Sequence, residues 1–204
     1  MVKILHASDK EAIQQAVFAA EQHTNAEIAV VVARASDEYR AIAMSYGLVL
    51  GSVIALLLWR EKIATGFPLL LFVQLFFAML FVTLPFLRHA CLRFAPVRLL
   101  HHRAAQRAAQ EYLHLARHLT PSVPIVLLYV SLAERYVHIH TSRSVREKIA
   151  DEQWHTVVKT LTSLVTTHGF SHAVIQALGH AGELLKQEFP AGDRVHGSPH
   201  VVER

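Results

Sequence analysis

The chain has 204 residues, of which 52% are hydrophobic and 18% are charged. This balance is too apolar for a disordered protein and is typical of a globular domain combined with membrane-spanning segments. We interpret the net charge of +4 as a membrane-topology signal, and not as a sign of nucleic-acid binding, because the basic residues gather beside the longest apolar stretches. The single cysteine, Cys91, excludes an intrachain disulfide.

The first expected elements are a helix and a strand within residues 8–33. The segment from Ser8 to Glu11 has the form of a capping box, and Ile13 and Val17 follow at helical spacing. Residues 27–33 are short, apolar and rich in β-branched side chains, as buried strands are. One helix and one strand cannot bury a core, so the rest of this domain must lie further along the chain.

Two apolar stretches follow, 41–59 and 63–87, with a polar triplet between them. Each is close to the roughly 20 residues that a helix needs to cross a bilayer, and neither contains Lys, Arg, Asp or Glu. We therefore expect a transmembrane hairpin inserted into the domain. Gly47 and Gly51 form a small-xxx-small pair, which favours close packing of helices within the hairpin or, alternatively, between two copies of the chain.

Basic residues determine the expected orientation of the hairpin. Two arginines precede it and five follow it, whereas the connection between the stretches carries one Arg and one Lys. The flanking arginines are Arg34, Arg40, Arg88, Arg93, Arg98, Arg103 and Arg107. Because Lys and Arg accumulate on the cytoplasmic side, we expect two spans in the cytoplasmic (inner) membrane, with both termini in the cytoplasm.

The pattern beyond the hairpin predicts a helix and a pair of strands. Apolar residues repeat at helical spacing over 104–119. An apolar run over 125–130, a polar turn and an alternating segment over 136–140 then predict a β-hairpin.

Two amphipathic helices are expected to complete the domain, one capped near Asp151 and one starting at Ser171 and ending at Pro190. Residues 191–204 are expected to be a C-terminal tail without a structural element. Residues 1–40 and 100–190 together then make one discontinuous α/β domain. Strands that are apolar on both faces predict a three-layer α/β/α arrangement around a small mixed sheet.

Two sequence strings make the chain resemble a known family. They are Thr24-Asn25-Ala26-Glu27-Ile28 at the entry to the first strand and Val130-Ser131-Leu132-Ala133-Glu134-Arg135-Tyr136 in the hairpin. Both are similar to the TPM domain, named after a thylakoid lumen protein, a photosystem II repair factor and a nematode receptor modulator. The likeness covers residues 8–190 and is greatest to short bacterial members that carry a transmembrane hairpin inside the domain.

The resemblance implies a three-layer α/β/α domain that assembles or maintains membrane complexes. Some members are described as acid phosphatases, and some bind calcium through clustered acidic residues. Where relatives often have a loop with Gly and Asp, this chain has Arg143 and Arg146. Calcium requires several carboxylate and carbonyl oxygens, so we expect no cofactor, with calcium as the alternative. The two arginines are candidate anion ligands at the start of a short helix.

Candidate catalytic residues are few. Gly-rich phosphate loops, CxxC, HExxH and nucleophile-elbow motifs do not occur in the sequence. Asp37 and Glu38 follow the first strand, a common place for ligand groups in α/β sheets. They would form a carboxylate site if their loop met Asp151 and Glu152 around a cation. Otherwise the segment is a solvated connector that leads into the first span.

Histidine is abundant, with 15 residues. His114 and His118 are spaced to share a helix face and are candidate metal ligands, and His138 and His140 share a strand face. Nothing in the sequence unites these pairs, so we expect mostly exposed histidines and no metal site.

We expect a membrane-anchored TPM-type module that binds other membrane proteins, or a second copy of itself, at the cytoplasmic membrane face. The alternative is a metal-dependent phosphatase, using calcium or magnesium, that acts on phosphate monoesters. An enzyme needs several polar groups that converge in a cleft, and the sequence offers few. The expected partners are the lipid bilayer and proteins, and not nucleic acid.

Overall fold

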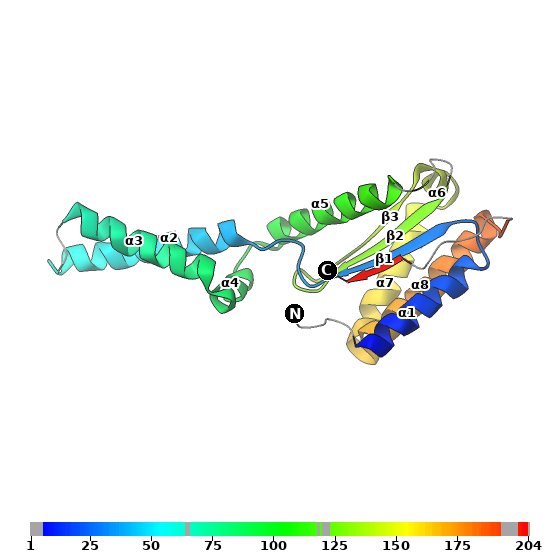
Figure 1. Cartoon of the computed structure of the whole chain (residues 1–204), viewed down its shortest axis with the longest axis horizontal. Coiled ribbons are helices and arrows are strands. Elements are labelled where there is room, and N and C mark those ends of the chain that lie inside the picture. The colour runs from blue at the N-terminus through cyan, green and yellow to red at the C-terminus, as the bar shows by residue number, and fades with distance from the viewer. Residues whose placement is uncertain (1–5, 64–65, 118, 120–122, 193–199, 204) are drawn as a thin grey trace. The chain divides into compact units, whose positions relative to one another are not determined.

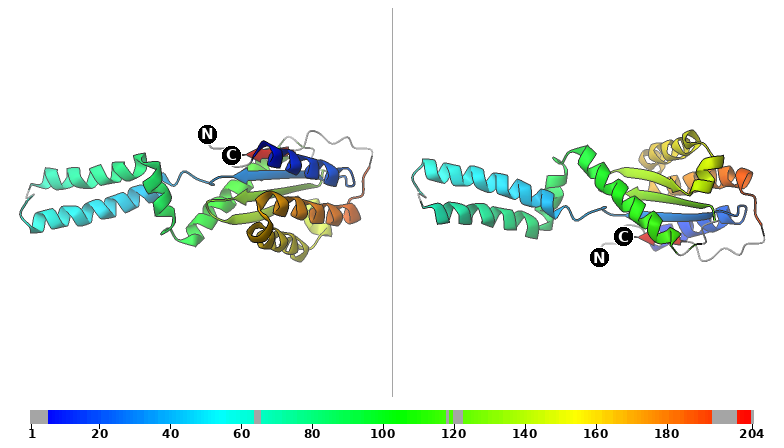
Figure 2. Two further views of the ribbon diagram at one scale, coloured as in Figure 1. Left: turned by 90° about the horizontal axis from the view of Figure 1, so that it is seen from below. Right: turned by 90° about the horizontal axis from the view of Figure 1, so that it is seen from above.

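The computed structural model describes residues 6–63, 66–117, 119, 123–192 and 200–203. The chain divides into two compact units, one of residues 1–36 with 101–204 and the other of residues 37–100. The elements in chain order are α1 (Ala7–Glu21), β1 (Glu27–Ala33), α2 (Arg40–Arg60), α3 (Phe67–Thr83), α4 (Pro85–Leu92), α5 (Val97–Ala116), β2 (Ile125–Ser131), β3 (Tyr136–Thr141), α6 (Arg143–Lys148), α7 (Asp151–His168), α8 (Phe170–Glu188) and β4 (His200–Glu203) (Figures 1 and 2).

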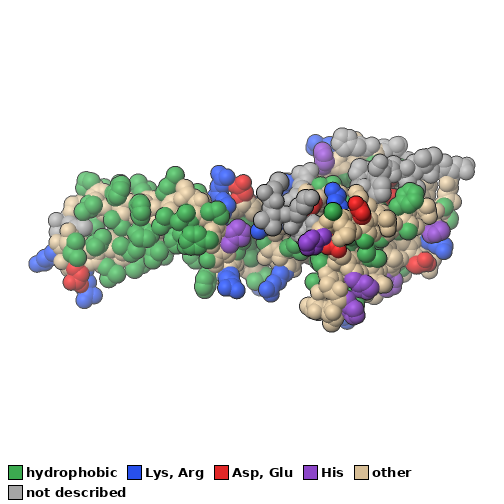
Figure 3. Space-filling model, turned by 60° about the horizontal axis from the view of Figure 1, so that its bottom comes forward, with side chains coloured by type: hydrophobic (Ala, Val, Ile, Leu, Met, Phe, Trp, Pro, Cys, Tyr) green, Lys and Arg blue, Asp and Glu red, His purple; other side chains and the backbone are tan. Residues whose placement is uncertain are grey.

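The unit of residues 37–100 contains the apolar stretches. Helix α2 is by itself long and apolar enough to cross a membrane, whereas α3 and α4 pass the same test only together. Apolar side chains cover the face of this unit that Figure 3 shows.

The predicted second span, 63–87, is not a single straight helix, and this prediction was wrong in its geometry. Helix α3 begins at Phe67 and ends at Thr83, and the axis bends by 88° before α4. Pro85 explains the break, because proline disfavours helical backbone angles in the residue before it and cannot donate a helical hydrogen bond. Leu84 is accordingly extended, with φ −88° and ψ 111°.

Helices α2 and α3 approach closely at Gly47 and Gly51. A Cβ atom at Gly47 would lie 2.6 Å from the carbonyl oxygen of Phe77, and one at Gly51 would lie 2.8 Å from Cα of Gln74. The side-chain amide of Gln74 also donates to the hydroxyl of Ser52, at 2.7 Å. The expected close packing within the hairpin is confirmed.

The other unit is an α/β domain built on a mixed sheet with strand order β3-β2-β1-β4. β1 runs parallel to β2 and β4, and β2 pairs with β3 in the antiparallel hairpin that the sequence predicts. Helix α5 covers one face of the sheet, and α1, α7 and α8 cover the other (Figures 1 and 2). The predicted three-layer α/β/α fold is therefore confirmed.

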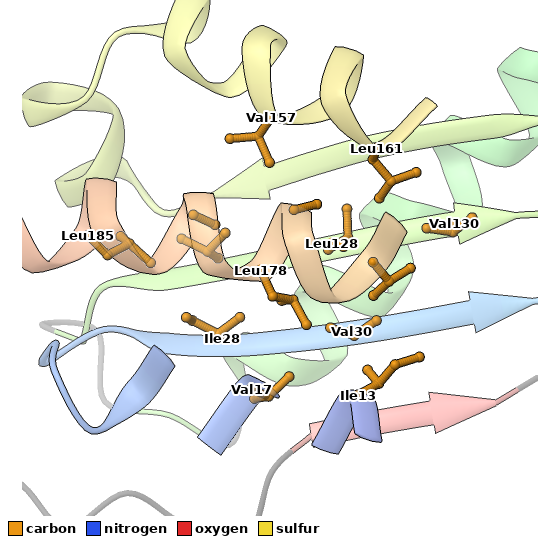
Figure 4. Close-up of a cluster of buried hydrophobic side chains, with 14 of the residues drawn as sticks. Ile13, Val17, Ile28, Val30, Leu128, Val130, Val157, Leu161, Leu178 and Leu185 are labelled. Carbon is orange, nitrogen blue, oxygen red and sulfur yellow. The ribbon is translucent and has the colours of Figure 1, made fainter. Parts of the chain in front are cut away.

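Every residue of β1 and β2 is buried, because helices cover both faces of the sheet. Ile28 and Val30 of β1 pack with Ile13 and Val17 of α1 on one face (Figure 4). On the other face Val31 and its neighbours pack against α5. This alternation explains why the two strands read as continuous apolar runs.

Two local expectations are corrected. Helix α1 begins at Ala7, so Ser8 lies inside the helix, and no side chain caps its N-terminus. The C-terminal segment contains β4, which pairs with β1, so the expectation of a tail without an element was wrong. Only Val201 and Val202 mark β4 in the sequence, which is too short for an alternating pattern to appear.

Candidate functional site

Polar side chains form a network at the carboxyl ends of β1 and β2. Glu134, which is 4% exposed, accepts hydrogen bonds from the backbone N–H of Ser36, at 2.8 Å, and from the hydroxyl of Ser131. The hydroxyl of Ser36 lies 2.9 Å from that of Ser131 and 3.0 Å from that of Tyr129. Burial raises the pKa of Tyr129, more than its hydrogen bond to Ser36 lowers it.

This network joins the turn between β2 and β3 to the end of β1, and its bonds are internal to the fold. It gives a structural role to the hairpin string that includes Ser131 and Glu134. The string at the entry to β1 has a similar role: the hydroxyl of Thr24 donates to the carbonyl of Phe189 at 2.7 Å, and the N–H of Ile28 donates to Glu21 at 2.8 Å. Both strings that resemble the TPM family therefore connect elements of the domain.

A groove lies along β3, between α5 and α7, with a volume of about 470 Å³. Its apolar lining includes Leu113 of α5, Ile139 of β3 and Val158 of α7. The titratable residues of its lining are Tyr112, His138, His140, Arg146, Asp151 and His155. The groove thus combines apolar walls with groups that can carry charge.

β3 forms an edge of the sheet, since among the described strands it pairs only with β2. Ser142 directly follows β3, and its N–H donates to the carbonyl of Ile125 in β2, at 2.9 Å. Backbone groups of successive strand residues point to opposite sides, so those of Val137, Ile139 and Thr141 point away from β2. The groove therefore offers backbone donors and acceptors at a sheet edge.

The imidazoles of His138 and His140 lie together on the face of β3 that α5 covers. Their ring centroids are 4.5 Å apart, and the ring of Tyr112 lies 5.8 Å from that of His140. Burial lowers the pKa of His140 to about 4, with further lowering by His138 and Arg146. Burial also lowers the pKa of His138, with His155 acting in the same direction and Asp151 against it. The shared strand face expected for these two histidines is confirmed.

Two buried polar atoms of groove residues have no hydrogen-bond partner in the described part of the chain. They are Nε1 of Trp154, a residue that is 5% exposed, and Nε2 of His140. A buried donor without an acceptor costs about 1–3 kcal/mol. The fold itself therefore leaves the hydrogen-bonding capacity of these two atoms unused.

The four candidate carboxylates divide between the two units. Asp37 and Glu38 belong to the unit of residues 37–100, and Glu38 forms an exposed ion pair with Arg40. Asp151 and Glu152 begin α7 in the α/β unit, and Asp151 lines the groove. Their joint role in a catalytic site stays a prediction.

The remaining site candidates also separate. Arg143 forms an exposed ion pair with Glu147, at 2.8 Å, while Arg146 lines the groove. His114 lies exposed on α5, and His118 lies outside the described residues. Across the described ranges, the structure shows no group of three or more His, Cys, Asp or Glu placed to hold a metal ion.

Sequence reasoning missed the part that α5 and α7 play in the groove. The helical spacing of Trp154 with Val157 and Leu161 predicts a core position, and its side chain is indeed buried. His155 and Tyr112 carried no distinguishing signal. The available signal was the pair of histidines on one face of a short alternating strand, because such a strand is often at a sheet edge.

No family model and no curated protein matches the chain. Its fold is similar to the NMR structure of the BA42 protein from the psychrophilic bacterium Bizionia argentinensis, with a TM-score of 0.59 and 14% sequence identity. The match covers 99% of this chain and 98% of that one. At this identity the likeness shows the fold alone.

Proposed function

We propose that this protein is a membrane-anchored TPM-type module that binds an extended segment of a partner protein along the edge of β3. The groove beside that edge is the observation that carries the proposal. A peptide in extended conformation can add a strand to such an edge, so that main-chain hydrogen bonds give affinity and flanking walls select side chains.

The geometry of the groove suits this mode of binding. The outward backbone groups of Val137, Ile139 and Thr141 are spaced along β3 as a fifth strand requires. Leu113 on one side and Val158 on the other would contact alternate side chains of the segment. The exposed Leu113 would lose its contact with water on binding, which adds an apolar contribution.

The anchoring part of the proposal rests on α2 and on the bent pair of α3 and α4. We propose that they form a hairpin in the inner membrane, with the α/β domain in the cytoplasm, because arginines flank the hairpin on the side of the domain. Fusions to the C-terminus test the orientation: green fluorescent protein should fluoresce and alkaline phosphatase should be inactive. Activity from the exported reporter alone would contradict this topology.

Photo-crosslinking in cells tests the binding surface. Benzoylphenylalanine in place of Leu113, in the wall of the groove, should yield a discrete crosslinked protein. The same residue in place of Leu132, which is 39% exposed in the turn outside the groove, is the matched control. The proposal fails if position 113 gives no adduct, or if both positions give the same adducts.

A further inference from the structure

We infer that the groove along β3 selects an anionic group, a carboxylate or a phosphate monoester, on the bound segment, and that Arg146 is its principal ligand. The origin of the anion in a partner segment rests on the proposed function. The selectivity for an anion rests on the groove alone, so an experiment can contradict the proposed function without contradicting the anion site.

Arg146 supplies a positive charge to the groove. It is an exposed cation that lines the groove, and in the part of the chain that the structure describes it forms no ion pair. Two other arginines of the domain are paired: Arg143 with Glu147, and Arg107 with Glu111 at 3.1 Å. A guanidinium presents parallel N–H donors, which fit a carboxylate or a phosphate.

Two unsatisfied buried atoms belong to residues that line the groove. Nε1 of Trp154 is a donor only, and Nε2 of His140 is a donor when the ring carries its proton there. An anion in the groove would supply an acceptor, directly or through a bridging water. Arg146 of α6, Trp154 of α7 and His140 of β3 all line the groove.

Charged and titratable groups of four elements line the groove. The groups that face the groove are Tyr112 from α5, His138 and His140 from β3, Arg146 from α6, and Asp151 and His155 from α7. Asp151 is the single carboxylate among them and opposes an anion. A bound anion would raise the pKa of His138 and of His140, so binding should take up protons and become tighter as the pH falls.

The test is an NMR titration of the full chain in phosphatidylcholine nanodiscs with labelled tryptophan. The chain has two indoles, and Trp59 in α2 serves as an internal control. Inorganic phosphate and acetate are the probes. We expect a saturable shift of the Trp154 signal, and a lower dissociation constant at pH 5.5 than at pH 7.5.

Variants identify the ligand. Arg146→Gln should weaken binding about tenfold or more, since it removes a charge-assisted hydrogen bond to the anion. Arg143→Gln, on the same short helix but paired with Glu147, should leave binding unchanged. Asp151→Asn should tighten it. Equal effects of the two arginine variants, or the absence of a saturable Trp154 shift, would overturn the inference.

A further titration separates the sources of the anion. If phosphatidylglycerol in the nanodisc shifts the Trp154 signal without added anion, lipid headgroups occupy the groove, and the assignment to a partner segment is overturned. If anions bind while crosslinking at position 113 yields no partner, the proposed function fails and the anion site remains.

Discussion

The carboxylate of Glu134 is expected to be a principal support of the turn between β2 and β3. It is buried and accepts hydrogen bonds from Ser36 and Ser131. Glu134→Gln should lower the free energy of unfolding by about 1.5–3 kcal/mol, because a buried hydrogen bond to a charged group is lost. Denaturant unfolding in detergent measures the change. Glu147→Gln is the control and should cost less than about 0.5 kcal/mol, since its ion pair is exposed; equal losses would contradict the role of Glu134.

His140 should make the stability of the α/β domain sensitive to acid. Its pKa is lowered to about 4 in the folded protein from an ordinary 6.5, so the unfolded chain binds more protons between these values. Stability should therefore fall as the pH drops through this window, by on the order of 1–2 kcal/mol after allowance for partial exposure of the ring.

The comparison of His140→Gln with the parent protein isolates this effect from that of the other histidines. Thermal unfolding at pH 7.5 and pH 4.5 should show a smaller loss on acidification in the variant. His102→Gln, at an exposed position on α5, should lose as much as the parent. An unchanged acid sensitivity in His140→Gln would contradict the prediction.

At the level of elements, the contact between α2 and α3 depends on glycine. Gly47→Ala places a Cβ atom 2.6 Å from a backbone oxygen of α3, so the helices must separate. We expect a loss of roughly 1–3 kcal/mol in hairpin stability, measured by thermal denaturation in detergent micelles. Gly66→Ala is the matched control, because its nearest contact would be 3.9 Å away. Equal stability of both variants would mean that close helix packing does not hold the hairpin.

Elements with a strong local pattern were predictable from the sequence, and those set by a single residue or a tertiary contact were not. The apolar runs of β1 and β2 and the alternation in β3 gave both the strands and the covered sheet. Pro85 lies near the end of the predicted second span, yet composition alone could not show that the helix bends there. β4 is defined by its pairing with β1, which no local pattern encodes.

At the level of the whole molecule, several residues of the candidate site were predictable from the sequence, but their assembly into one groove was not. Arg146, Asp151, His138 and His140 were all singled out from the sequence, each for a separate reason. The groove needs the edge position of β3 and the approach of α5 and α7 from opposite faces of the sheet. These relations arise from tertiary packing. The helices α2, α3 and α4 also separate β1 from α5 in the sequence, so the order of elements does not reveal that the two are neighbours.

Amide hydrogen exchange of peptides covering residues 136–142 tests whether a partner occupies the edge of β3. The outward amides of Val137, Ile139 and Thr141 should exchange more slowly in native membranes, where the partner is present, than in the purified protein in nanodiscs. Leu113→Lys, which charges the wall of the groove without entering the core, should abolish this difference. Equal exchange of these peptides in native membranes and in nanodiscs would contradict the claim.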